Sequence, residues 1–191
     1  LVWDQAIGKP TIFDRVQSRI GNQIERFWGL HPWANRPLLE IPSSPLVDWA
    51  DIIDLRNLFS GFFNLWALPE LSRKRPVVWR LPDMWGLTGH CAYPYDCQRW
   101  ITGCFDCPLL TKEGRKKVEP PPTQFDGTRR VWKAKRDLYQ QSKLQIVVTT
   151  QWMKRNVDQG ILQGAESVNV ISNGVNLDVY RPIPQKEPPN V

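Results

Sequence analysis

Residues 51–81 of this 191-residue chain read DIIDLRNLFSGFFNLWALPELSRKRPVVWRL. The two ends of this stretch, 51–58 and 76–81, hold short apolar runs that favour strands, and residues 61–72 between them favour a helix. A strand, a helix and a second strand in this order are typical of a βαβ unit, in which the two strands are parallel. This stretch therefore predicts an α/β fold.

The same alternation continues towards the C-terminus. Asp126 suits the N-cap of a helix, and Asn173-Gly174 suits a tight turn after the last strand. The further elements that we expect are a helix from Asp126 to about Ser142, a strand over 144–149, a helix over 151–163 closed by Gly164, and a strand over 168–171. The pattern predicts a Rossmann-like parallel sheet flanked by helices, with a Cys-rich loop as an insertion.

The two ends of the chain differ from this middle part. Apolar residues at helical spacing predict an amphipathic helix over 11–28, and four prolines predict that 29–50 is mostly loop. The last residues are again rich in proline, which favours a tether over a packed element. We expect one domain over 1–183, incomplete at its start, and a linker over 184–191.

The composition is that of a globular protein, with 41% hydrophobic and 23% charged residues. Ten tryptophans are unusual and suit contacts with sugars, lipids or a partner protein. No apolar run approaches the roughly 20 residues of a membrane-spanning helix, and the N-terminus lacks the order of a signal peptide. We expect a cytoplasmic protein whose cysteines are reduced.

Positive charge is concentrated in residues 112–143. This segment holds ten basic and four acidic residues and so accounts for the whole net charge of +6. One interpretation is a solvated loop and helix face. The other is a patch that meets an anionic membrane surface or phosphate. We expect no nucleic acid as a partner, because the sequence carries no recognition motif for it.

Ligands of open parallel sheets bind beyond the carboxyl ends of the strands. Four segments should meet there, namely 56–57, 82–85, 150–152 and 172–174. Arg56 and Asn57 follow one strand, and Arg56 could clamp an anionic group or pair with a nearby aspartate. Asp83 could hydrogen-bond a sugar or cap a turn, and Trp85 could stack on a sugar ring or pack within the loop.

All four cysteines follow the second strand, with the spacing C-x5-C-x6-C-x2-C at Cys91, Cys97, Cys104 and Cys107. Four thiolates complete a tetrahedral zinc shell, and the last pair has the spacing of a zinc knuckle. Free thiols and disulfides are the alternatives. In each case the cysteines would stabilise a long loop that is poor in apolar residues.

Four segments together resemble the N-terminal domain of family 4 (group 1) glycosyltransferases of GT-B fold. They are DIIDLRNLFSGFFN, PVVWRLPDMWGLTGHCAYPYDCQRWITGCFDCPLL, IVVTTQWM and VISNGVNLDVYRP, and the likeness covers roughly residues 47–184. The resemblance implies a retaining enzyme that transfers a sugar from a nucleotide-sugar donor to a polysaccharide or lipid-linked acceptor, often at the inner membrane face. The donor would be bound mainly by a C-terminal domain outside this chain.

What the resemblance implies for single residues follows from the matching positions. Arg56, Asn57, Asp83 and Trp85 would line the acceptor side, and Asn173 and Gly174 would lie near the interdomain cleft. Pro82 stands where such enzymes place a histidine, and a proline side chain transfers no proton. No catalytic residue is therefore assigned.

Two other functions are left open by the sequence. One is a non-catalytic carbohydrate-binding or scaffolding homologue that has lost the active-site histidine. The other is a zinc-stabilised nucleic-acid module, which only the charge of the chain favours.

Overall fold

The computed structural model describes residues 41–58, 63–110 and 123–181, together with positions 16, 19–21, 23 and 27. These six N-terminal positions are helical, as expected for part of 11–28, and the rest of that expected helix lies outside the described residues. Most of the loop expected over 29–50 lies outside them too. Its described end contains a short helix, α3 (Pro45–Trp49), which the sequence analysis missed.

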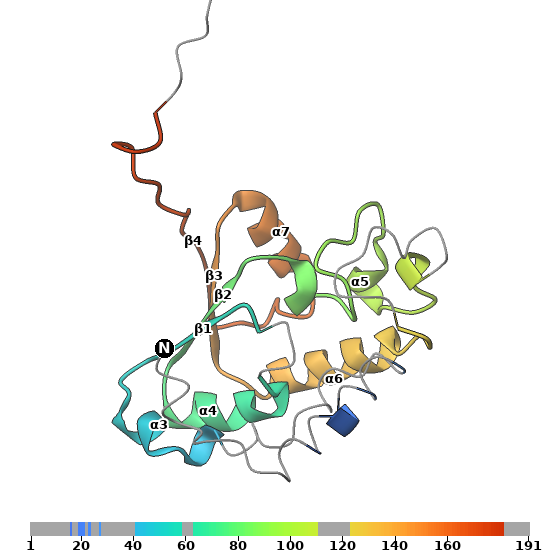
Figure 1. Cartoon of the computed structure of the whole chain (residues 1–191), viewed down its shortest axis with the longest axis horizontal. Coiled ribbons are helices and arrows are strands. Elements are labelled where there is room, and N and C mark those ends of the chain that lie inside the picture. The colour runs from blue at the N-terminus through green and yellow to red at the C-terminus, as the bar shows by residue number, and fades with distance from the viewer. Residues whose placement is uncertain are drawn as a thin grey trace, which may run out of the picture.

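A four-stranded parallel sheet forms the centre of the molecule (Figure 1). The strands lie in the order β1-β2-β3-β4, and each is hydrogen-bonded to the next one along the chain. Their bounds are Ile53–Arg56, Val77–Leu81, Leu144–Val148 and Ser167–Val170. All four expected strands are present, and the α/β, Rossmann-like fold class is confirmed.

Helices connect the strands at the expected places, but some of their ends differ. The main ones are α4 (Leu68–Lys74), α5 (Arg99–Thr102), α6 (Thr128–Gln140) and α7 (Gln151–Gln159). Short 3₁₀ turns cover Leu65–Ala67, Met84–Gly86 and Pro108–Leu110. The expected end of α7 at Gly164 is wrong, because the helix already ends at Gly160, whose N–H donates to the carbonyl of Val157.

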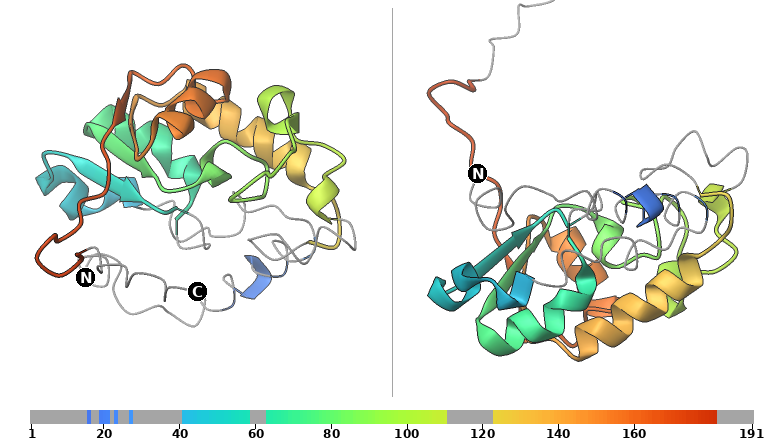
Figure 2. Two further views of the ribbon diagram at one scale, coloured as in Figure 1. Left: turned by 90° about the horizontal axis from the view of Figure 1, so that it is seen from above. Right: turned by 60° about the horizontal axis from the view of Figure 1, so that its bottom comes forward.

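The long helices cover one face of the sheet. Right-handed crossovers between neighbouring parallel strands place every connecting helix on the same side, and Figure 2 shows α4, α6 and α7 there. The side chains of Leu55, Trp79 and Ile146, one from each of three strands, are almost completely buried beneath them. Trp79 meets Tyr139 of α6 edge to face, with ring centroids 5.5 Å apart.

The other face of the sheet carries polar residues. Arg56 and Arg80 are partners in the register of β1 and β2, so their side chains leave from the same face. Arg80 is in turn level with Val147, and Val147 with Asn169. This alternation of buried and exposed positions is what places arginines next to the carboxyl ends of the strands.

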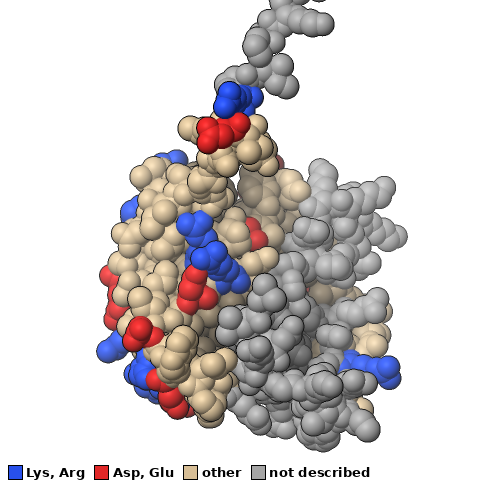
Figure 3. Space-filling model, turned by 60° about the vertical axis from the view of Figure 1, so that its left-hand side comes forward, with Lys and Arg blue, Asp and Glu red and all other residues tan. Residues whose placement is uncertain are grey.

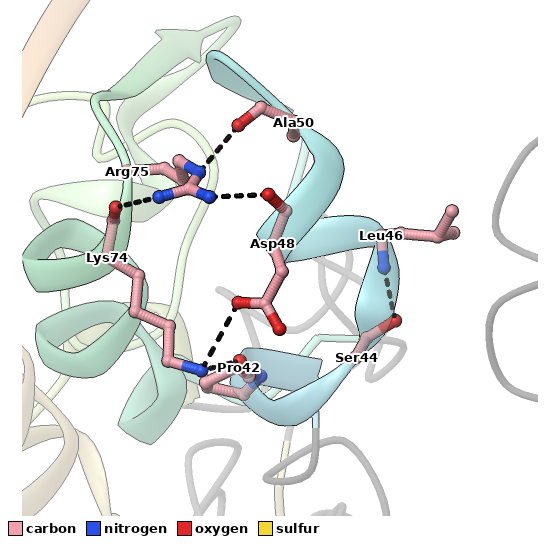
Figure 4. Close-up of polar contacts among 7 residues, drawn as sticks. All are labelled: Pro42, Ser44, Leu46, Asp48, Ala50, Lys74 and Arg75. Carbon is pink, nitrogen blue, oxygen red and sulfur yellow. Dashed lines mark hydrogen bonds and ion pairs between the residues drawn. The ribbon is translucent and has the colours of Figure 1, made fainter.

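Two basic residues at the end of α4, Lys74 and Arg75, hold α3 by hydrogen bonds (Figure 4). The guanidinium of Arg75 donates to the carbonyls of Ala50 and Asp48. Lys74 donates to the carbonyl of Pro42 at 2.7 Å and lies 3.8 Å from a carboxylate oxygen of Asp48. These bonds satisfy carbonyls of a helix too short to be stable on its own.

After β4 the chain leaves the body of the molecule (Figure 1). Residues 171–181 are all exposed, and the linker expected over 184–191 lies outside the described residues. Among the described residues, no helix has the length and apolar character needed to cross a membrane.

Candidate functional site

The parallel register brings the carboxyl ends of all four strands to one edge of the sheet. We call the segments that follow the strands there the rim, namely residues 57–58, 82–97, 149–152 and 171–174. The rim contains the four segments that the sequence analysis expected to meet, apart from Arg56, which is the last residue of β1. In parallel α/β sheets this edge is where ligands bind.

Arg56 pairs with a neighbour on its own strand. Its Nε and Nη2 lie 2.8 and 2.6 Å from Oδ2 of Asp54, and both side chains are well exposed. The hydrogen bond that Arg56 donates to Asp54 and the charge of Asp54 raise the pKa of the Arg56 guanidinium above its ordinary value. Asn57 follows with a φ of 41°, a left-handed conformation that asparagine tolerates well.

Asp83 caps a turn, which was one of the two roles considered for it. Its Oδ1 accepts the N–H of Trp85 at 2.8 Å and so starts the 3₁₀ turn Met84–Gly86. Burial raises the pKa of the Asp83 carboxyl, although the bond from Trp85 and the charge of Lys135 oppose the shift. The carboxylate stays half-exposed at the rim, so a hydroxyl ligand could still reach it.

The structure does not support the expectation that Trp85 lines the acceptor side and matches the alternative, packing within the loop. Only 5% of Trp85 is exposed, and it belongs to the hydrophobic core. The ammonium of Lys135 lies 3.5 Å from the centroid of its ring. Because a lysine already occupies that ring, the indole has no open face for a sugar.

Lys135 is a residue that the sequence analysis placed wrongly, since it counted it in the basic surface segment. Its side chain is completely buried and donates to the carbonyls of Trp85 and Thr88 at 2.6 and 2.9 Å. Burial lowers the pKa of Lys135 to about 7, against the opposing influence of Cys104, Cys91 and Asp83. Helical periodicity is the sequence signal that could have predicted the burial of Lys135. Position 135 falls on the apolar face of α6, four residues after Val131 and four before Tyr139.

The four cysteines lie in one region of the loop. Cys91 is buried, the other three are half-buried, and all four are free thiols. Burial is the main cause that raises the pKa of Cys91 and of Cys104 to about 12, and each of these thiols also responds to the charges of other cysteines of the set. The N–H of Gly89 donates to Sγ of Cys104 at 3.1 Å.

The structure does not bring the four thiols together as a zinc site. Within the described residues, which include all four cysteines, no group of three or more Cys, His, Asp or Glu side chains could hold a metal ion. The structure therefore gives no support to the predicted metal. Zinc binding stays a prediction.

Asn173 is linked to β2 across the open face of the sheet. Arg80 donates to Oδ1 of Asn173 at 2.7 Å and lies 3.5 Å from the carbonyl of Ile171. The N–H of Ile171 donates to Val148, which continues the ladder of β3 and β4 by one bond. Arg80 therefore holds the exposed segment with Asn173 and Gly174 near the rim, a role that the sequence analysis did not foresee.

Part of the basic segment 112–143 lies outside the described residues. Within its described part, Arg129, Arg130 and Lys133 are exposed on α6, whereas Lys135 is buried. Arg136 pairs with Asp137 at 2.8 Å. On the face drawn in Figure 3, basic and acidic side chains are mixed.

A hollow of about 180 Å³ lies at the opposite edge of the sheet. It is lined by Ile101 of α5, by α6 from Trp132 to Gln140, by Leu144 at the start of β3 and by the turn 160–165 before β4. Leu144 and the turn 160–165 place this part of the hollow at the amino ends of β3 and β4.

The chain was also compared with known proteins. It is similar to WcaC of Escherichia coli, a protein named as a colanic acid biosynthesis glycosyl transferase, with 29% identity over 136 residues. The alignment covers 66% of this chain and 31% of WcaC, so the chain spans about a third of that relative. No family model matches the chain, and no solved structure does.

Proposed function

We propose that this chain is the acceptor-side part of a retaining glycosyltransferase of GT-B type. The protein would transfer a sugar from a nucleotide-sugar donor to a polysaccharide or lipid-linked acceptor. The similarity to WcaC carries the proposal, because a glycosyl transferase aligns with two thirds of this chain. The parallel sheet, whose strands all end at one rim, is the kind of scaffold on which such a site is built.

The rim supplies groups suited to bind an acceptor. Arg56 is well exposed, and Asp54 is its one charged partner among the residues that the structure describes, so a second anionic group on the acceptor could share its guanidinium. Asn57 and the half-exposed carboxylate of Asp83 add hydrogen-bonding groups for sugar hydroxyls. The nucleotide would be held mainly by a second domain, towards which residues 171–181 lead.

Pro82 is exposed at the rim, and its side chain cannot transfer a proton, so we assign proton transfer to no side chain at this position. In a retaining transfer the leaving phosphate of the donor can accept the proton of the acceptor hydroxyl. A positioned protein base contributes about 10²–10⁴ in rate, so its loss slows the reaction without preventing it. Slow turnover is therefore expected.

Release of nucleoside diphosphate tests this proposal. The full-length protein is incubated with UDP- and GDP-linked hexoses and a lipid-linked saccharide extract, and products are followed by mass spectrometry. We expect diphosphate release from at least one donor, with a hexose added to the acceptor. Residues 1–191 alone serve as the matched control and should give no turnover, because the proposal assigns donor binding mainly to a second domain.

A non-catalytic carbohydrate-binding protein is the second candidate, favoured by Pro82. In that case the full-length protein binds saccharide but releases no diphosphate from any donor of the panel. That outcome would replace the proposed transferase by the binding protein.

The acceptor role of Arg56 has its own test. Replacing Arg56 by Ala should raise the acceptor KM several-fold, because a charge-assisted hydrogen bond to the acceptor is lost, and leave kcat nearly unchanged. Arg73→Ala, which removes an exposed arginine from α4, is the matched control. An unchanged KM in Arg56→Ala would remove Arg56 from the site.

A further inference from the structure

Three aromatic side chains gather at the rim, and no role has been assigned to them so far. We call Tyr93, Tyr95 and Trp152 the aromatic cluster. The rings of Tyr93 and Tyr95 meet edge to face with centroids 5.0 Å apart, and the rings of Tyr93 and Trp152 lie 6.1 Å apart with an interplanar angle of 32°. Two of these residues follow β2 and the third follows β3, so the cluster joins neighbouring segments of the rim.

The cluster is held by rigid parts of the fold. Trp152 lies in the first turn of α7, and the next residue, Met153, is buried in the core. Thr150 caps this helix by accepting the N–H of Met153 at 3.1 Å. On the other side, the carbonyl of Ala92 accepts the N–H of Met84 at 2.8 Å and fixes the loop just before Tyr93. The rings are therefore positioned before any ligand arrives.

Exposure of the cluster to water is energetically unfavourable. Tyr93, Tyr95 and Trp152 are 53%, 46% and 46% exposed, although aromatic side chains gain most from burial. Tyr95 has a φ of 52°, a conformation that is unfavourable for a bulky residue. Contiguous exposed apolar groups and strained residues are both concentrated at binding sites.

The surroundings of the cluster indicate the chemistry of its ligand. The slightly positive C–H bonds of one pyranose face fit the negative face of an aromatic ring. Asp96 and Gln151, which adjoin Tyr95 and Trp152 in sequence, are exposed and offer a carboxylate and an amide to hydroxyl groups. The exposed Asp96, next to Tyr95 in sequence, disfavours an anionic lipid surface, and the ammonium of Lys154 on the same helix as Trp152 is already paired with Asp158.

We propose that Tyr93, Tyr95 and Trp152 form a subsite that stacks on pyranose rings of the acceptor saccharide. That the bound saccharide is the acceptor rests on the proposed function. That the cluster binds saccharide rests on the exposed rings themselves. The cluster takes the place that the sequence analysis gave to Trp85. It extends the acceptor site from Arg56 and Asp83 along the rim towards α7.

Saturation-transfer NMR with simple sugars tests the subsite. The full-length protein is mixed with lactose, cellobiose and maltotriose at millimolar concentrations. Because stacking uses the C–H face that pyranoses share, we expect transfer to the ring C–H protons of at least one probe. Tyr93→Ala and Trp152→Ala should each weaken this binding about tenfold, as loss of a central aromatic contact does.

The chain offers a matched control in Trp49 on α3, which is 83% exposed and lies outside the rim. Trp49→Ala should bind the probes as the unchanged protein does. Circular dichroism and thermal unfolding check that each variant is folded, and Trp152→Leu, which keeps apolar bulk without a ring, replaces any variant that is not.

Three results would overturn the subsite. They are transfer to none of the probes, equal binding by the cluster variants and the unchanged protein, and binding to phosphatidylglycerol vesicles that the variants lose while sugar binding is retained. These results are separate from the test of the proposed function. If sugar binding depends on the cluster but no diphosphate is released, the subsite is supported and the transferase proposal is contradicted. If diphosphate is released but sugar binding does not depend on the cluster, the transferase is supported and the subsite is contradicted.

Discussion

Lys135 lies beneath the loop that forms most of the rim, and its ammonium is the buried charge on which that loop depends. Two carbonyls and the ring of Trp85 surround it, and Cys91, Cys104 and Asp83 are the titratable groups that act on it. Hydrogen bonds satisfy the ammonium, but they do not replace all of its hydration. This is why the pKa of Lys135 falls to about 7.

The lowered pKa of Lys135 predicts how stability changes with pH. Between about pH 7 and the ordinary lysine value of 10.5 the unfolded chain holds a proton that the folded chain has lost, so the free energy of unfolding rises with pH. Below pH 7 both states are charged and the effect is constant. We expect a rise of about 1 kcal/mol per pH unit between pH 7 and 9, measured by urea unfolding.

Lys135→Met should remove this slope, and Lys133→Met, at an exposed position of the same helix, should keep it. The upper limit of pH 9 matters, because the raised pKa of the Cys91 and Cys104 thiols lowers stability above their ordinary value of 9.0. An identical slope in Lys135→Met and the unchanged chain would contradict the burial of a titrating lysine.

The cysteines allow a prediction about metal. Four clustered cysteines would bind zinc only if their thiols ionise and move into one tetrahedral shell. We predict about one zinc per chain in protein purified without chelators, measured by elemental analysis, and a lower melting temperature after its removal. Protein that contains no zinc and shows four titratable thiols would establish that the cysteines are free.

The sequence predicted which residues lie near the rim, but not the direction of every side chain there. Strand ends were sufficient to place Arg56, Asp83 and Trp152 near one edge, because the period of a strand and the register of a parallel sheet leave little freedom. The sequence could not show that Trp85 points into the core and Trp152 outwards. The inward position of Trp85 involves a tertiary contact, because Lys135, which lies 50 positions away along the chain, reaches its ring and its carbonyl.

Among the elements, α6 has two tasks. Its apolar face packs on the sheet, and several of its polar groups hold the Cys-rich loop. Besides Lys135, Tyr139 donates to the carbonyl of Gly86 at 3.0 Å, and Trp132 donates to the carbonyl of Trp100 at 2.8 Å. Just before the helix, Asp126 accepts the N–H of Cys107 at 2.7 Å.

Asp126 caps the start of α6, although the residue at the N-cap position is Gly127. Its Oδ1 accepts the backbone N–H of Thr128 at 2.9 Å and the hydroxyl of Thr128 at 2.6 Å. Burial raises the pKa of Asp126, but the bonds from Thr128 and Cys107 outweigh burial and leave the pKa below its ordinary value. The expected cap is thus off by one residue.

Gly89 is where the loop comes closest to α6. A Cβ at this position would lie 2.2 Å from the carbonyl oxygen of Thr128, which is backbone and cannot move aside cheaply. Gly89→Ala should therefore lower the free energy of unfolding by about 1–3 kcal/mol or more, measured by urea unfolding.

Gly164→Ala is the matched control for Gly89→Ala. Nothing lies within 4 Å of a Cβ at Gly164, so this change should be neutral or stabilise the fold by about 0.4–1 kcal/mol through the unfolded state. Equal stabilities of the two variants would show that the loop does not pack against α6 as described.

Elements were easier to predict than their ends. Strands follow from short apolar runs between breakers, and all four were found. The end of α7 was misplaced because Gly160 and Gly164 are both suitable helix terminators, and tertiary contact decides between them. A Cβ at Gly160 would lie 3.2 Å from Leu87 and 3.3 Å from Trp100, so this glycine is where the helix end meets the loop.

At the scale of the whole molecule, the two edges of the sheet differ in character. At the carboxyl ends of the strands, the rim holds the aromatic cluster and Asn173. Arg56, which is exposed, and Arg80, which donates to Asn173, lie next to it on β1 and β2. The opposite edge holds a hollow next to α6 and the turn 160–165. We expect saccharide to bind at the rim and not at the hollow.

Hydrogen exchange of the full-length protein, followed by mass spectrometry with and without a saccharide acceptor, tests this placement most directly. We predict that saccharide slows exchange in residues 92–97, 149–153 and 171–174 and leaves residues 140–144 and 160–165 unchanged. Slower exchange around the hollow with no change along the rim would contradict the account.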